Sequence, residues 1–126
     1  MLPKWHILFG FVFSYVLVAF FNLPLTSGII IFLSSFLIDL DHYIGGTIYF
    51  HETNPLKIIP KLYRFHHVWV SLPQREKERY KVMIMPFHGI EALTILFLLS
   101  FINKIFILIL VGFTFHLIID LSLIHI

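Results

Sequence analysis

The stretch IFILILVGFTFHLIID, residues 105–120, decides the fold class of this chain. It is apolar along almost its whole length and carries His116 and Asp120 at its end. An apolar stretch of this kind forms a helix that must be covered by a protein core or by lipid. Because three similar stretches precede it, the sequence predicts an all-α bundle of about four helices.

The predicted helices are the four apolar runs of the chain, at residues 7–21, 28–40, 82–102 and 105–119. A polar, aqueous segment, 43–81, separates the second run from the third, and its Pro55, Pro60 and Pro73 are expected to interrupt helices. The last two helices are joined only by the short connection 103–104. We therefore expect them to form an antiparallel hairpin.

Composition indicates that water is not the main solvent of this protein. Of its 126 residues, 59% are hydrophobic and 13% are charged, against about half and about a quarter in soluble domains. The length suits a single domain, 1–126, with one core. We predict an integral membrane bundle. The alternative, a water-soluble helical protein, leaves too little polar surface to cover four apolar runs.

The predicted topology brings the ionisable residues of the helices to one membrane face. If the first helix starts at this face, the second ends there, the third starts there and the fourth ends there. The residues that meet at this face are His6, Asp39, Asp41, His42, His88, Glu91, His116 and Asp120. Eight of the nine Lys and Arg residues lie on the same side. By the positive-inside rule this side is cytoplasmic, in a multi-pass membrane protein.

Most of these residues form pairs of an imidazole and a carboxylate, three or four residues apart on one helix face. The pairs are Asp39 with His42, His88 with Glu91, and His116 with Asp120, and Asp41 adjoins the first of them. A charge within a span costs about 2.5 to 3.5 kcal/mol, and a shared cation offsets this cost. For any single pair, a hydrogen bond between packed helices is the alternative.

The ligand chemistry restricts which metal such a cluster could hold. The chain has no cysteine, so a metal would be bound by nitrogen and oxygen, a set suited to zinc, manganese or iron. A site of two or three zinc ions would activate water and neutralise a phosphate. His66 and His67 are further candidate ligands, and because adjacent side chains on a helix diverge by about 100°, we expect only one of them to join the site.

Several function classes have no support in the sequence. There is no nucleophile elbow, no phosphate-binding glycine loop and no His-Glu-x-x-His motif, so serine hydrolases, P-loop NTPases and zincins are disfavoured. The net charge of +2 is small and gives no support to nucleic-acid binding.

Four motifs follow one another in an order that resembles a known family. They are WHILFG at 5–10, LIDLDH at 37–42, FHG at 87–89 and GFTFHLIID at 112–120. With these motifs the chain resembles the membrane-bound, metal-dependent hydrolases, also described as LexA-binding, inner-membrane-associated hydrolases. That family is similar to the zinc-dependent phospholipases C and the single-strand-specific zinc nucleases, all-helical enzymes with polynuclear zinc sites. The resemblance implies a water between the metals as nucleophile and these ligand positions: His6, Asp39, Asp41, His42, His88, His116 and Asp120.

Residues and resemblance together predict a hydrolase of phosphoester bonds in a lipid or lipid-linked substrate, with membrane lipid around it. Asp41 or Glu91, where it is not a metal ligand, is the expected proton acceptor. One alternative is a non-catalytic, metal-stabilised membrane protein that docks a cytoplasmic partner through 43–81. Another, an ion or proton pathway, would need polar residues on the opposite face, which has almost none.

Overall fold

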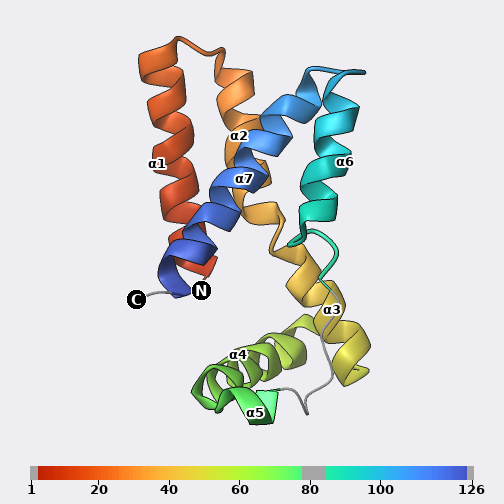
Figure 1. Ribbon diagram of the computed structural model, residues 1–126. Coiled ribbons are helices and arrows are strands. Elements are labelled where there is room, and N and C mark those ends of the chain that lie inside the picture. Colours follow the sequence, from red (N-terminus) through yellow and green to blue (C-terminus); the bar gives the residue numbers. More distant parts are fainter. Residues whose placement is uncertain (1–2, 78–84, 125–126) are drawn as a thin grey trace. The chain divides into compact units, whose positions relative to one another are not determined.

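The computed structural model describes residues 3–77 and 85–124, and these residues form helices and no strand (Figure 1). The all-α prediction is therefore confirmed for this part of the chain. The helices fall into two compact units. The first unit is Met1–Asp39 with Pro86–Ile126, and the second is Leu40–Met85.

The first unit contains four helices, which are α1 (Pro3–Phe21), α2 (Leu25–Leu37), α6 (Ile90–Ser100) and α7 (Ile105–Ile124). Helix α7 packs against α2, α6 and α1, and α1 also packs along α2 (Figure 1). Asn22 ends α1 with a positive φ of 52°, a conformation that asparagine adopts more readily than most residues. The connection at Asn103 and Lys104 joins α6 to α7, and the two helices contact each other as the predicted hairpin requires.

Small residues let α7 approach α2 closely. A Cβ added to Gly112 of α7 would stand 2.6 Å from the carbonyl oxygen of Ile31 and would overlap the hydroxyl of Ser34, both in α2. Gly10 of α1 faces Ser35 of α2 in the same way. Such contacts are typical of helices that pack in lipid, where small residues allow backbones to come together.

Replacing Gly112 by alanine is expected to destabilise the first unit. The new Cβ would meet the Ile31 carbonyl, which is backbone and cannot rotate away, so α7 must move off α2 at a cost of about 1–3 kcal/mol. The control is Gly89→Ala, whose Cβ meets the end of the flexible Glu91 side chain. Thermal unfolding in detergent measures both variants, and equal melting temperatures would contradict the close contact of α2 with α7.

Several predicted helix boundaries were wrong. The helix predicted at 82–102 begins only at Ile90, because Pro86 lacks an N–H group and Gly89 has extended backbone (φ −103°, ψ 162°) at the N-cap; residues 82–84 lie outside the described part. Helix α2 ends at Leu37 instead of residue 40, and α7 continues to Ile124 instead of stopping at 119. The apolar pattern of a sequence locates a helix but does not mark the residues at which the helix begins and ends.

The described residues of the second unit form three helices in what the sequence predicts as an aqueous segment, namely α3 (Leu40–Phe50), α4 (Pro55–Ser71) and α5 (Gln74–Lys77). The Asn54 side chain caps α4 by accepting the N–H of Leu56 at 3.0 Å, and Pro55 occupies the first turn, where its missing N–H costs nothing. The expectation that Pro60 interrupts a helix is wrong, since it lies inside α4. The packing of α4 against α3 holds the helix together across the lost hydrogen bond.

Within the described residues, two segments are long and apolar enough to cross a membrane by length and composition, Leu25–Phe50 and Ile105–Ser122. Trp5–Phe21 and Ile90–Ser100 are shorter apolar helices. Many large apolar side chains of the first unit are exposed, among them Phe20, Leu25, Ile90, Phe101 and Ile102. A surface of this kind is typical of contact with lipid or with another protein.

Candidate metal centre

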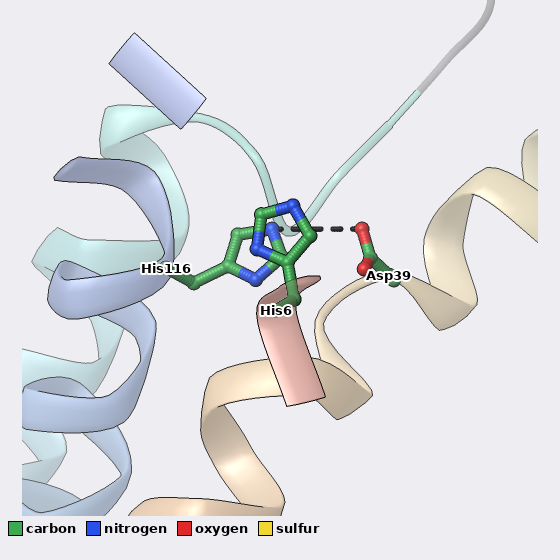
Figure 2. Close-up of side chains that lie close together, drawn as sticks. All are labelled: His6, Asp39 and His116. Carbon is green, nitrogen blue, oxygen red and sulfur yellow. Dashed lines mark ion pairs between the residues drawn. The ribbon is translucent and has the colours of Figure 1, made fainter. Parts of the chain in front are cut away.

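Five predicted ligands lie together in the first unit: His6, Asp39, His88, His116 and Asp120. They form two overlapping groups that are able to hold a metal ion, His6 with Asp39 and His116, and His88 with His116 and Asp120. In each group one ligand atom per residue lies within 4.8 Å of the others. Figure 2 shows the imidazole rings of His6 and His116 over one another, beside the carboxylate of Asp39.

Helix ends and helix spacing bring these residues together. His116 and Asp120 are four residues apart on α7, so they project from one face. Asp39 lies in the turn after α2, where its N–H donates to the carbonyl of Phe36 at 3.1 Å and the chain leaves the helix. His88 lies just before α6, in the turn that ends at Gly89. His6 lies near the start of α1. The cluster thus draws on two helices, α1 and α7, and on two places where other helices stop or start.

His116 is at the centre of the cluster and is fully buried, with 0% of its side chain exposed. Its Nδ1 lies 2.6 Å from the carbonyl oxygen of Ser35. A carbonyl can only accept, so Nδ1 carries the proton and donates it, and in the neutral ring Nε2 then has a free lone pair. Metal-binding histidines are usually held in this way by a hydrogen bond from the nitrogen that does not bind the metal.

The end of α2 explains why the Ser35 carbonyl is free to accept this bond. The last four carbonyl groups of a helix have no donor within the helix. Because α2 ends at Leu37, Ser35 is among these four. The same ending directs Asp39 into the turn beside the cluster. One helix end therefore supplies both an acceptor that orients His116 and a carboxylate for the site.

Around His116 the donor atoms are spaced as the ligands of one small cation would be. Its Nε2 is 3.2 Å from Nε2 of His88, 3.2 Å from Oδ2 of Asp120 and 3.5 Å from Oδ1 of Asp39. Nε2 of His88 is 3.7 Å from Oδ2 of Asp120 and 3.8 Å from Oδ1 of Asp39. A tetrahedral zinc ion with bonds of about 2.0–2.1 Å separates its ligand atoms by about 3.3–3.4 Å. The donor set and its spacing therefore suit a metal ion.

His6 extends the cluster to the other carboxylate oxygen of Asp120. Its Nε2 lies 3.1 Å from Oδ1 of Asp120, and its ring stacks on that of His116 at 4.0 Å. His6 is 2% exposed, and its Nδ1 is buried with no hydrogen-bond partner in the part of the chain that the structure describes. Leaving such an atom unsatisfied costs about 1–3 kcal/mol. A bound ion or water would remove this cost.

Four other predicted ligands belong to the second unit, and their membership of this site stays a prediction. Asp41 is buried in the first turn of α3, and its Oδ1 lies 3.1 Å from Nδ1 of His42. His66 and His67 are both exposed on α4, and the ring of His67 packs edge-on against Tyr63 at 4.5 Å. The expectation that only one of these two histidines joins the site also stays a prediction.

Glu91 lies in the first turn of α6 and is exposed. Within the described residues it belongs to neither of the two groups in the first unit. A carboxylate at this position interacts favourably with the N-terminal end of the helix dipole, which gives Glu91 a structural role. Its predicted roles as a ligand and as a proton acceptor stay predictions, as does the second of these for Asp41.

Sequence reasoning missed the orienting acceptor at Ser35. A backbone carbonyl leaves no mark in the sequence, because every residue type has one. An indirect signal was present, since Ser34 and Ser35 are small residues at the point where Gly10 and Gly112 approach α2. A close contact between helices there could have been expected from the four small residues together.

No family model, curated protein or solved structure matches this chain. The family resemblance suggested by the motifs therefore stays a prediction.

Proposed function

We propose that this chain is a membrane-embedded, metal-dependent hydrolase whose metal centre is built from His88, His116, Asp39 and Asp120. The observation that carries the proposal is the pair of imidazole nitrogens, Nε2 of His88 and Nε2 of His116, which face each other at 3.2 Å. The Ser35 carbonyl fixes the proton of His116 on Nδ1. The two Nε2 atoms then point toward the same space beside two carboxylates. A divalent cation bound there would accept a lone pair from each of the four groups.

Zinc fits this donor set best, although manganese and iron accept the same ligands. A bound zinc ion would polarise a phosphoryl oxygen and activate a water molecule. The chain's own residues keep the carboxylates in place. His6 holds Oδ1 of Asp120 at 3.1 Å, which leaves Oδ2 directed toward His88 and His116. The buried Nδ1 of His6 is the nitrogen best placed to bind a second ion.

Phosphoester bonds in a lipid or lipid-linked molecule are the proposed substrate. The support is the position of the cluster, in the same unit as a candidate membrane-spanning segment, Ile105–Ser122. The side chains of Asp39 and Asp120 are 25% and 24% exposed, so a substrate could reach the carboxylate side of the cluster. An amphiphile held in the bilayer would present its phosphate near such a site.

The proposed membrane location is multi-pass, with the cluster on the cytoplasmic side. Support comes from the two candidate spans and from the basic residues, of which seven of nine lie at 43–81. Lys and Arg in loops favour the cytoplasmic face. A reporter fused after position 126 or inserted near Lys104 would place the two faces on opposite sides if the topology holds.

Metal content measured by inductively coupled plasma mass spectrometry tests the centre directly. We expect zinc in the detergent-purified wild-type protein and its loss in His116→Ala and Asp39→Ala. The matched control is His51→Asn, since His51 is exposed in the second unit with a φ of 50° that asparagine tolerates. Absence of metal from the wild type, after purification without chelator and reloading with zinc, would overturn the proposal.

A non-catalytic, metal-stabilised protein is the second candidate, and one observation favours it. Ligand atoms of His88, His116 and Asp120 lie within 4.8 Å of one another, and Asp39 Oδ1 lies 3.5 Å and 3.8 Å from the two histidines. Structural zinc sites are closed by four protein ligands, and these four residues would supply them. Turnover separates the two functions. Hydrolysis of a phosphodiester lipid that disappears with the metal supports the enzyme, whereas tightly bound zinc without turnover of phosphoester lipids supports the structural protein.

A further inference from the structure

Helix α4 has three distinct faces, and the first of them packs on α3. Ile58 is fully buried, and Leu62 lies against Gly46, where an added Cβ would stand 2.7 Å from its methyl group. The ring of Phe65 contacts Tyr49 at 5.2 Å and Phe50 at 5.9 Å. This inward face fixes which sides of α4 point away from the rest of the unit.

The second face is apolar and exposed. It consists of Leu56, Ile59, Tyr63 and Val70, whose spacings of three, four and seven residues place them on one stripe of the helix. All four are exposed, and Leu56 reaches 85%. On a helix wheel this stripe is about 120° from the packed face. It is therefore separate from the surface that α3 covers.

The third face is basic. Lys57, Lys61 and Arg64 are spaced by four and three residues, so they form a second stripe, about 135° around the helix from the apolar one. Helix α4 contains no acidic residue. Lys61 lies 3.8 Å from Glu52, whereas Lys57 and Arg64 have no ion pair within the described residues. Across 40–85 there are seven basic residues and four acidic ones.

We propose that α4 lies in the plane of the membrane interface, against a surface of anionic phospholipid. Leu56, Ile59, Tyr63 and Val70 enter the boundary between headgroups and acyl chains, and the basic stripe contacts the phosphates. A helix with an apolar stripe and Lys and Arg on its polar side is the arrangement that binds anionic bilayers. Charge complementarity favours this occupant over a second copy of the chain, whose own basic stripe would be repelled.

The end of α4 supports the same placement. Trp69 is partly exposed, and the ammonium group of Lys77 lies over its ring at 4.5 Å. Tryptophan and lysine are residues that settle at headgroup depth. The inference rests on the proposed membrane location, and it adds that the second unit binds the lipid surface by itself through α4. It does not depend on the metal centre.

Spin labels on the full-length protein test the placement, and the absence of native cysteine makes single-site labelling simple. Ile59→Cys marks the apolar stripe and Arg64→Cys marks the basic one. Each labelled protein is reconstituted into phosphatidylcholine vesicles with or without phosphatidylglycerol, and collision with oxygen is compared with collision with a water-soluble nickel complex. We expect the label at 59 to collide mainly with oxygen and the label at 64 mainly with nickel, with the contrast larger when phosphatidylglycerol is present.

Three results would overturn the inference. Collision of the label at position 59 with the nickel complex in both kinds of vesicle would mean that the apolar stripe faces water and is free to bind a protein partner. Shielding of the label at 59 from both reagents would mean that a second copy covers it. Failure of the chain to insert, judged by extraction with alkaline carbonate, would remove the membrane location as well. Zinc content of the same samples shows separately whether the proposed metal centre has failed.

Discussion

Replacing Asp120 by asparagine is expected to abolish both metal binding and hydrolysis. Both carboxylate oxygens of Asp120 face the cluster, Oδ1 at 3.1 Å from His6 and Oδ2 at 3.2 Å from His116. Asparagine keeps the size of the side chain but removes its charge and one acceptor. Loss of an outer-shell partner alone lowers metal affinity by about 10–100-fold, so loss of a ligand should exceed about 100-fold.

Competition with a zinc chelator measures the affinity, and turnover of a phosphodiester lipid measures the activity. The control is Glu76→Gln, which also neutralises a carboxylate but at an exposed position on α5. Wild-type zinc affinity in Asp120→Asn would exclude Asp120 as a ligand. Wild-type activity with lowered affinity would place the metal outside the catalytic step.

Replacing His6 by phenylalanine is expected to remove one metal ion per chain and leave another in place. Phenylalanine preserves the ring that stacks on His116 at 4.0 Å but has no nitrogen to replace the buried, unpartnered Nδ1. If that nitrogen binds a second ion, the zinc-to-protein ratio falls by one. Activity should fall with it, because a two-ion site stabilises both the attacking and the leaving oxygen.

The ratio of zinc to protein, measured over a series of zinc concentrations, decides between the two possible roles of His6. An unchanged ratio in His6→Phe would mean that His6 only holds Asp120 in position. In that case Asn at position 6, which can still donate a hydrogen bond toward Oδ1, should recover activity. Recovery of activity by Asn together with loss of an ion would mean that the second ion is not needed for hydrolysis.

Sequence reasoning was better at predicting which residues lie close together than at predicting where the surrounding helices begin and end. His116 and Asp120 could be paired because a helix interior has a fixed repeat, so a spacing of four residues determines a shared face. His6, Asp39 and His88 were placed at the same face by alternating helix directions, and in the structure they lie near that pair in the first unit. Their role as metal ligands stays a prediction. Topology is a strong constraint when hydrophobic runs are this clear.

The helices of the second unit were not predicted, because their signals differ from those of the apolar runs. Helix α4 is amphipathic and carries Pro60 in its interior. In the sequence alone, a proline predicts the end of a helix. Its packing against α3, which includes the contact of Leu62 with Gly46, comes from residues distant in the sequence. Helix propensities of single residues do not predict contacts of that kind.

The hydrogen bond from His116 to the Ser35 carbonyl has a consequence for how the cluster tolerates mutation. Every side chain that could occupy position 35 leaves the same carbonyl in place, so substitution there changes packing against Gly10 without deleting the acceptor. Most single substitutions at position 35 should therefore leave the orientation of His116 unchanged. Insertions and deletions in α2 should disturb it instead, because they would rotate the helix end and move both the carbonyl and Asp39 away from His116.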